Sequence, residues 1–166
     1  CVDMANCAIE ALDKGIACLN SYSPQLAQEV RDLEDKTDHY EDILGSYLVK
    51  LSSLQVADAA TAESAMLLKA IGDFERISDH AVNIVESAEE IRDKSISFSP
   101  FANAELKMLR GAVDETIEIT LQSFMNSDYD RAALVEPLEQ VIDDLRDQIK
   151  LNHILRLQTS ECTIEH

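Results

Sequence analysis

The 166-residue sequence contains no tryptophan, only four glycines and three prolines, and 5% aromatic residues. Alternating runs of β-branched residues, which mark β-strands, are also missing. This shortage of turn-forming and strand-forming residues argues against a β-sandwich or a barrel, so we expect an all-α protein. With 46% hydrophobic residues, the chain is long enough to bury a core.

The sequence also lacks cysteine pairs and long apolar runs. Cys1, Cys7, Cys18 and Cys162 show neither a CxxC motif nor metal-ligand spacing. We therefore interpret them as small hydrophobic residues in a reducing compartment. No stretch approaches the roughly 20 apolar residues of a membrane span, so we expect this segment to be soluble, without direct insertion into a membrane.

Basic residues are scarce as well. Lys and Arg number 14 against 32 Asp and Glu, which gives a formal net charge of −18. A field of this sign repels nucleic acid phosphates and anionic membrane surfaces, so we expect no nucleic acid partner. Cations and basic proteins are the natural ligands, although acidic residues also serve simply to keep long helices soluble.

The helix boundaries follow from capping residues and apolar periodicity. Two Ser-Pro pairs, Ser23-Pro24 and Ser99-Pro100, each combine an N-cap with the proline tolerated in a first helical turn. With Asp58 and Asp128 as further caps, the pattern predicts five helices in an elongated bundle. Their ranges are about 2 to 21, 24 to 54, 58 to 94, 100 to 126 and 129 to 158.

An apolar face follows the helix predicted at 24 to 54, and it includes Val30, Leu33, Ile43, Tyr47 and Leu48. These positions fall on one side of a helix with 3.6 residues per turn. We therefore expect all of them to pack against other helices.

The chain repeats itself at an offset of 105 residues, which places Val30 on Val135 and Leu33 on Leu138. The repeat predicts two three-helix units, at residues 1–97 and 98–166. In the second repeat, the helix equivalent to the third helix would begin near residue 163, and the sequence stops at His166. We therefore expect the second unit to lack its last helix and to expose an apolar groove that favours self-association.

Three acidic pairs share one spacing, with an Asp four residues after a Glu. On a helix, such residues lie about 40° apart around the axis and one turn along it, so both carboxylates face the same way. Their oxygens suit Mg, Mn, Ca or iron. Chance pairs in a solvated face are the alternative, but recurrence at equivalent repeat positions favours a metal site. The pairs are Glu34 with Asp38, Glu75 with Asp79, and Glu139 with Asp143.

Neighbouring residues qualify this hypothesis. Glu41 and Asp42 extend the acidic stripe along the second helix, and Arg76 is able to pair with an acid on another helix. His80 follows Asp79 directly and so points about 100° away from it, which favours a capping or packing role. A ferritin-like di-iron site is excluded, because the Glu-x-x-His motif does not occur in the sequence.

Three segments carry a family resemblance: DFERISDHAVNIVESAEEI, YEDILGSYLVKLSS and VEPLEQVIDDL. They resemble the PhoU domain, in the variant that forms the cytoplasmic C-terminal part of bacterial sodium/phosphate cotransporters, and the closing RLQTSECTIE is also similar to that variant. The resemblance implies tandem three-helix bundles. It also implies clusters of divalent or trivalent metal ions on acid-x-x-x-Asp motifs, with iron first and manganese, zinc or magnesium as alternatives.

Matched position by position, the family motif assigns the first cluster to Glu34, Asp38, Glu75 and Asp79. Glu139 and Asp143 supply half of the second cluster, because the fourth motif falls beyond the sequence. Ser78 stands where many members have glycine, a small change because both residues are small.

The resemblance further implies a non-enzymatic regulatory domain of a sodium-dependent phosphate transporter, on the cytoplasmic face of the inner membrane. Its partner would be the permease part of the transporter, and homo-oligomers are a second possibility. The alternatives are a free-standing PhoU-type regulator of phosphate transport and the phosphate-starvation response, and a metal-free acidic helical adaptor. A metallohydrolase is disfavoured, because no nucleophile with a base and no glycine-rich phosphate loop accompanies the acids.

Overall fold

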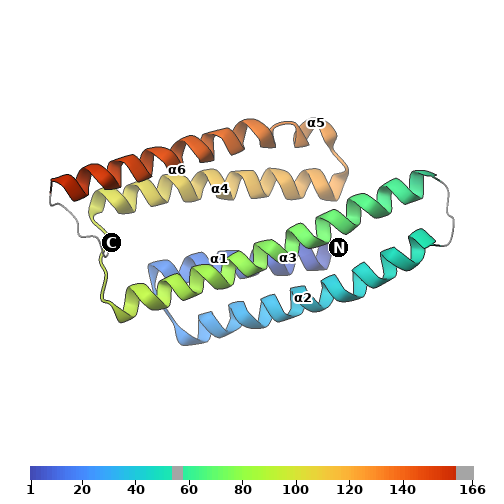
Figure 1. The fold of residues 1–166 in the computed structure, drawn as a ribbon, viewed down its shortest axis with the longest axis horizontal. Coiled ribbons are helices and arrows are strands. Elements are labelled where there is room, and N and C mark those ends of the chain that lie inside the picture. The colour runs from blue at the N-terminus through green and yellow to red at the C-terminus, as the bar shows by residue number, and fades with distance from the viewer. Residues whose placement is uncertain (54–57, 160–166) are drawn as a thin grey trace. The chain divides into compact units, whose positions relative to one another are not determined.

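The computed structural model describes residues 1–53 and 58–159, so Cys162 and most of the segment RLQTSECTIE lie outside the described residues. All regular structure in the described part is helical, which confirms the all-α prediction. The chain divides into two compact units, Cys1–Ser95 and Ile96–His166. Each unit is a helical bundle (Figure 1), as expected for tandem PhoU-like bundles.

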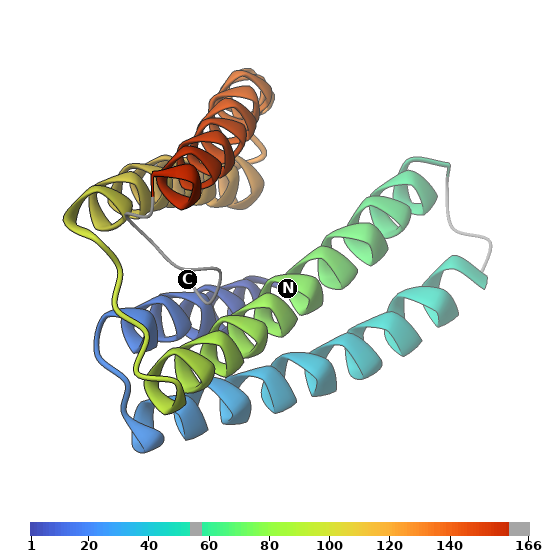
Figure 2. The ribbon, with the colours of Figure 1, turned by 60° about the vertical axis from the view of Figure 1, so that its left-hand side comes forward.

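The first unit is a bundle of three helices, α1 (Val2–Asn20), α2 (Pro24–Ser53) and α3 (Asp58–Asp93), each in contact with the other two. α1 has 19 residues, whereas α2 has 30 and α3 has 36. α1 therefore lies along only the half of the α2–α3 hairpin that contains the start of α2 and the end of α3 (Figure 2).

The expectation that the whole apolar face of α2 is packed is wrong, because α1 is too short to cover it. Val30, beside α1, is fully buried, but Ile43 and Tyr47 are 52% and 62% exposed. Their periodicity is that of a packed face, but they lie on the part of α2 that α1 does not reach. Leu48 is nevertheless 5% exposed, so burial continues along α2 on another side of the helix.

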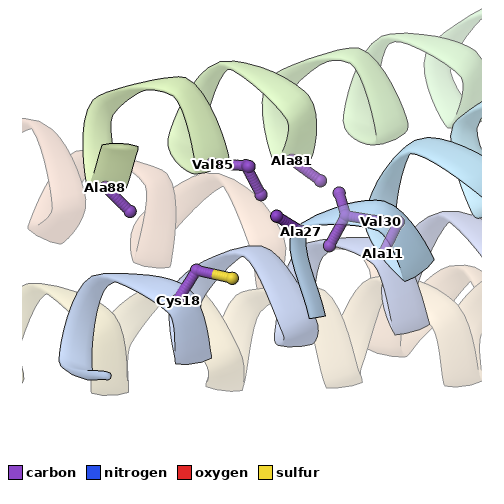
Figure 3. Packing of buried hydrophobic residues seen from close by; sticks show 7 residues of the cluster. All are labelled: Ala11, Cys18, Ala27, Val30, Ala81, Val85 and Ala88. Atoms are coloured by element: carbon purple, nitrogen blue, oxygen red, sulfur yellow. The ribbon is translucent and has the colours of Figure 1, made fainter. Parts of the chain in front are cut away.

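Small side chains form the core where α1 and α3 approach each other (Figure 3). At Gly15 on α1, an added Cβ atom would lie 2.9 Å from the backbone oxygen of Ala81 on α3. The two backbones are therefore closer than any side chain at position 15 permits. The buried cluster comprises Ala11, Cys18, Ala27, Val30, Ala81, Val85 and Ala88.

A polar network ties α2 and the α1–α2 connection to the end of α3. Nη2 of Arg31 donates to both carboxylate oxygens of Glu89 at 3.1 Å, and the Tyr22 hydroxyl donates to Oε1 of Glu89 at 3.0 Å. The guanidinium of Arg92 lies over the ring of Tyr22, 4.1 Å from its centroid. The ion pair between Arg31 and Glu89 and the cation–π contact between Arg92 and Tyr22 thus hold the last turns of α3 in place.

Glu89→Gln is expected to weaken this network and to remove part of the pH dependence of stability. The hydrogen bond from Arg31 holds the pKa of Glu89 below its ordinary value, against the opposing effect of burial. A carboxylate whose pKa is lowered by folding contributes stability above its unfolded pKa and loses it as pH falls through the folded pKa. We expect a loss of about 1 kcal/mol at neutral pH that shrinks below about pH 4.

Urea unfolding followed by circular dichroism over a pH series measures this difference. Glu86→Gln is the matched control, because Glu86 is exposed on the same helix and the substitution removes the same charge. Equal losses in the two variants at neutral pH would show that the network contributes nothing specific.

The second unit contains α4 (Pro100–Asn126), α5 (Tyr129–Ala132) and α6 (Val135–Gln158), with α4 packed against both others. As expected, Ser99 and Asp128 act as N-caps: the Ser99 hydroxyl accepts from the amide of Ala102 at 3.2 Å, and Asp128 accepts from the amide of Arg131 at 3.0 Å.

The single helix expected at 129 to 158 is instead interrupted at residues 133 and 134, which form a turn between α5 and α6. Pro137 explains the interruption. In a continuous helix its ring would clash with the carbonyl group of Ala133, and it has no N–H to donate. A restart at Val135 places Pro137 in the first turn of α6, where proline is tolerated.

α4 and α6 share a polar contact and also leave much apolar surface exposed. Nη2 of Arg156 lies 2.8 Å from Oε2 of Glu105, and the Asn152 amide donates to Oε1 of Glu105 at 2.7 Å. Large apolar residues that are at least 47% exposed in this unit are Phe101, Met108, Met125, Tyr129, Leu134, Val141, Leu151, Ile154 and Leu155. Self-association through this surface stays a prediction.

No helix in the described part of the chain combines the length and the apolar character that crossing a membrane requires.

Candidate metal site

The first acidic pair lies on the side of α2 that approaches α3. Glu34 is half-buried and Asp38 is exposed, whereas Thr37 between them is fully buried. The Thr37 hydroxyl donates to the carbonyl oxygen of Leu33 at 2.8 Å, so its polar group is satisfied within α2. The two carboxylates therefore flank a packed, small residue at the edge of the helix interface.

The second acidic pair on α3 has the same pattern. Glu75 is half-buried, Asp79 is exposed, and Ser78 between them is fully buried. The Ser78 hydroxyl donates to the carbonyl oxygen of Glu75 at 2.8 Å. Small hydroxyl residues beneath both pairs permit close packing of the helices that carry the carboxylates.

The carboxylates of α2 and α3 interact across the interface. Burial raises the pKa of Glu34 above its ordinary value, and nearby negative charge raises it further. That charge comes from Asp35 and Asp38 on α2 and from Asp79 on α3. The negative charge of Asp79 on α3 thus contributes to the raised pKa of a carboxyl group on α2.

The reverse effect occurs at Glu75. Burial raises its pKa, and the charges of Asp79 on α3 and of Glu41 on α2 add to the rise, as do a hydrogen bond with Asp79 and the charge of Asp38. The charges of the two acidic pairs therefore influence one another across the α2–α3 interface. The structure also adds Glu41, which the sequence placed only as an extension of the stripe.

No cation among the described residues compensates this acidic surface. Within residues 1–53 and 58–159, none of the four carboxylates makes an ion pair, and the exposed Arg76 makes none either. In the same ranges, no group of three or more His, Cys, Asp or Glu side chains stands ready to hold a metal ion. The site is thus an acidic strip with hard oxygen donors, suited in chemistry to attract cations.

The third acidic pair, in the second unit, has a different environment. Glu139 and Asp143 line one surface depression of about 520 Å³, together with Glu136 and Gln140. Nη1 of Arg146 lies 2.6 Å from Oδ1 of Asp143, so part of the negative charge is neutralised within α6. This pair is less suited than the first two to attract a cation.

Comparison with known proteins identifies the family to which this chain belongs. A model of the PhoU domain matches residues 2–88, which is more than half of the chain. The chain belongs to the PhoU domain family. The similarity to PhoU proposed from the sequence is confirmed at this level, and the matched region contains the candidate metal site.

Three curated relatives are similar over most of the chain. The phosphate-specific transport system accessory protein PhoU homolog of Aquifex aeolicus is 27% identical over 150 residues, which cover 90% of this chain and 66% of the relative. PhoU homolog 1 of Thermotoga maritima is 24% identical over 164 residues (94% and 67%), and the Borreliella burgdorferi homolog is 24% identical over 151 residues (86% and 66%).

The PhoU chain described here spans about two thirds of the length of these relatives. No solved structure matches it significantly.

Proposed function

We propose that this chain is a non-enzymatic PhoU-type regulator of phosphate transport. The observation that carries the proposal is the PhoU domain match over residues 2–88. The names of the three relatives, all accessory proteins of a phosphate-specific transport system, support the same role. An accessory role also agrees with the lack of a nucleophile–base pair in the acidic motifs.

The names of the relatives favour a separate accessory regulator over a domain of a sodium/phosphate cotransporter. The cotransporter hypothesis rests on the resemblance of residues 73–91 and neighbouring segments. Under either hypothesis the partner is a phosphate transporter, which this chain would contact at the cytoplasmic face of the inner membrane. In the cotransporter hypothesis this partner is the permease part of the same protein.

Our proposal includes metal binding at Glu34, Asp38, Glu75 and Asp79. Divalent or trivalent cations suit this donor set, with iron first by family resemblance and manganese, zinc or magnesium as alternatives. Burial is the main cause of the raised pKa of Glu34 and of Glu75, and neighbouring negative charges add to it. A bound cation would offset both effects by favouring the charged carboxylates. When bound, the metal would link α2 to α3 and neutralise part of their charge.

Disruption of the gene in its host tests the regulatory role. We expect phosphate uptake at high external phosphate to change, and the wild-type gene to restore it. Uptake that is the same with and without the gene would contradict a role in phosphate transport. Metal analysis of protein purified without chelator separately distinguishes the metal-binding regulator from the metal-free acidic adaptor.

A further inference from the structure

Exposed apolar side chains follow one side of α4 and one side of α6 in the second unit. On α4, Phe101 and Met108 are seven residues apart, and on α6, Val141 and Leu155 stand seven and twenty-one residues after the N-cap Leu134. Seven residues make nearly two helical turns, so the members of each set lie along the same side of their helix. All five side chains are at least 47% exposed. We call these five residues the apolar stripe.

The two halves of the apolar stripe lie on the same side of the helix pair. Leu106 on α4 and His153 on α6 line one shared depression, so both lie on the side of the pair that carries this depression. Met108 and Leu155 each follow one of these residues by two positions and are therefore rotated by about 200° from it. The apolar stripe thus forms one surface, on the side opposite the depression.

Comparison with the first unit shows that this surface is not needed for packing within a unit. The offset of 105 residues, which matches Val30 with Val135 in the core, places four members of the apolar stripe on charged residues. One of these, Glu29, accepts a hydrogen bond from Nζ of Lys14 at 2.7 Å and so belongs to an ion-paired edge between α1 and α2. The pairs are Met108 with Asp3, Leu134 with Glu29, Val141 with Lys36, and Leu155 with Lys50. The second unit thus has apolar residues where the first unit has a polar edge.

Negative charge accompanies the apolar stripe. Residues 96–159 contain eleven acidic and six basic residues, so the second unit repels anions. Glu115 follows Met108 by seven residues and Asp144 follows Val141 by three, and both are exposed. Neither forms an ion pair with a described residue. The net charge of −18 also disfavours a second copy of the chain or an anionic lipid surface as the occupant.

We infer that the apolar stripe is a docking site for an amphipathic helix of a partner protein, with Lys and Arg beside the apolar face of that helix. Two packed helices with apolar side chains at seven-residue spacing offer the surface on which a third helix packs. Gly111 adds room for its backbone, because no described residue lies within 4 Å of a Cβ atom placed there. Docking at this surface goes beyond the proposed regulatory role and requires no metal.

A synthetic amphipathic helix made of Leu and Lys tests the site, with binding to the full chain followed by fluorescence anisotropy. We expect it to bind at least about tenfold more tightly than a peptide of the same composition whose shuffled order removes the apolar face. Electrostatic attraction alone would hold both peptides equally, because they carry the same charge. Equal affinities would therefore overturn the inference.

A double variant that keeps the net charge locates the binding surface. Met108→Asp with Leu155→Lys introduces the residue types of the equivalent positions in the first unit, and we expect it to weaken binding by at least about tenfold. The matched control is Met66→Asp with Val49→Lys, which changes two residues of the first unit that are 50% and 60% exposed. This control is expected to bind as the wild type does. Circular dichroism checks that both variants keep their helices.

Methyl NMR of the wild type gives a readout that needs no variant. The methyl signal of Met108 is expected to shift when the Leu–Lys helix is added, whereas that of Met66 in the first unit is expected to stay in place. Shifts at Met66 with none at Met108 would place the peptide on the first unit and overturn the inference.

Three further outcomes would also contradict the helical partner. The first is a wild type that does not bind the Leu–Lys helix, and the second is equal binding by the two double variants. The third is a wild type that self-associates in sedimentation while Met108→Asp with Leu155→Lys is monomeric, because a second copy would then be the occupant. None of these outcomes changes the expected effect of the gene on phosphate uptake, so the proposed function is tested separately.

Discussion

Saturating Mn²⁺ is expected to raise the free energy of unfolding of this chain by about 2.7 kcal/mol at a free ion concentration one hundred times the dissociation constant. Asp79→Asn is expected to remove most of that gain. Asp79 raises the pKa of both Glu34 on α2 and Glu75 on α3. Its charge therefore acts on carboxylates of both helices, and under the proposed metal binding it is the motif residue whose loss affects both.

Without metal, the same substitution is expected to act in the opposite direction. Like charges one helical turn apart destabilise a helix by about 0.2–0.5 kcal/mol per pair. Asp79→Asn removes one charge of such a pair with Glu75, and it also reduces the repulsion of Glu34. The metal-free variant is therefore expected to be a few tenths of a kcal/mol more stable than the wild type.

Urea unfolding in EDTA and in Mn²⁺, followed by circular dichroism, measures both effects. Asp73→Asn is the matched control, because Asp73 is exposed on α3 and is not among the charges that raise the pKa of Glu34 or Glu75. It is expected to keep the full metal-induced gain. Equal gains in the two variants would mean that the metal binds away from Asp79.

Local sequence signals predicted most helix ends, because each end depends on residues next to it. Ser23 and Ser99 each accept a hydrogen bond from the amide three residues on, at 3.4 and 3.2 Å. The break at residues 133 and 134 was missed although its cause, Pro137, is also local. Pro137 lies nine residues after Asp128, the N-cap of the predicted helix. It therefore lies beyond the first turn of a helix that begins at Tyr129.

Tertiary features were harder to predict from the same sequence. Periodicity marks the apolar side of α2, but it does not reveal how far a neighbouring helix extends, and so it failed at Ile43 and Tyr47. The acid-x-x-x-Asp spacing places two carboxylates on one side of one helix. The side of α3 that faces α2, and the contact of the Glu41 carboxylate with Gly72, depend on how the two helices pack. The spacing of residues within one helix does not reveal either.

The close approach of α1 and α3 leads to the second large prediction, that Gly15→Ala destabilises the first unit by about 1–3 kcal/mol. The new Cβ atom would lie 2.9 Å from the oxygen and 3.4 Å from the Cα atom of Ala81. Both atoms belong to the backbone of α3, so no side chain rotation relieves the contact. α1 has to move away from α3, which loosens the core around Val85.

Gly111→Ala separates this steric effect from helix propensity. Both glycines lie inside helices, where alanine is favoured by about 0.5–1 kcal/mol, but nothing lies within 4 Å of a Cβ atom at position 111. Chemical denaturation should therefore show opposite signs, a loss for Gly15→Ala and a gain for Gly111→Ala. A gain in both variants would mean that α1 and α3 do not meet at Gly15 and Ala81, because only a backbone contact there cancels the preference for alanine.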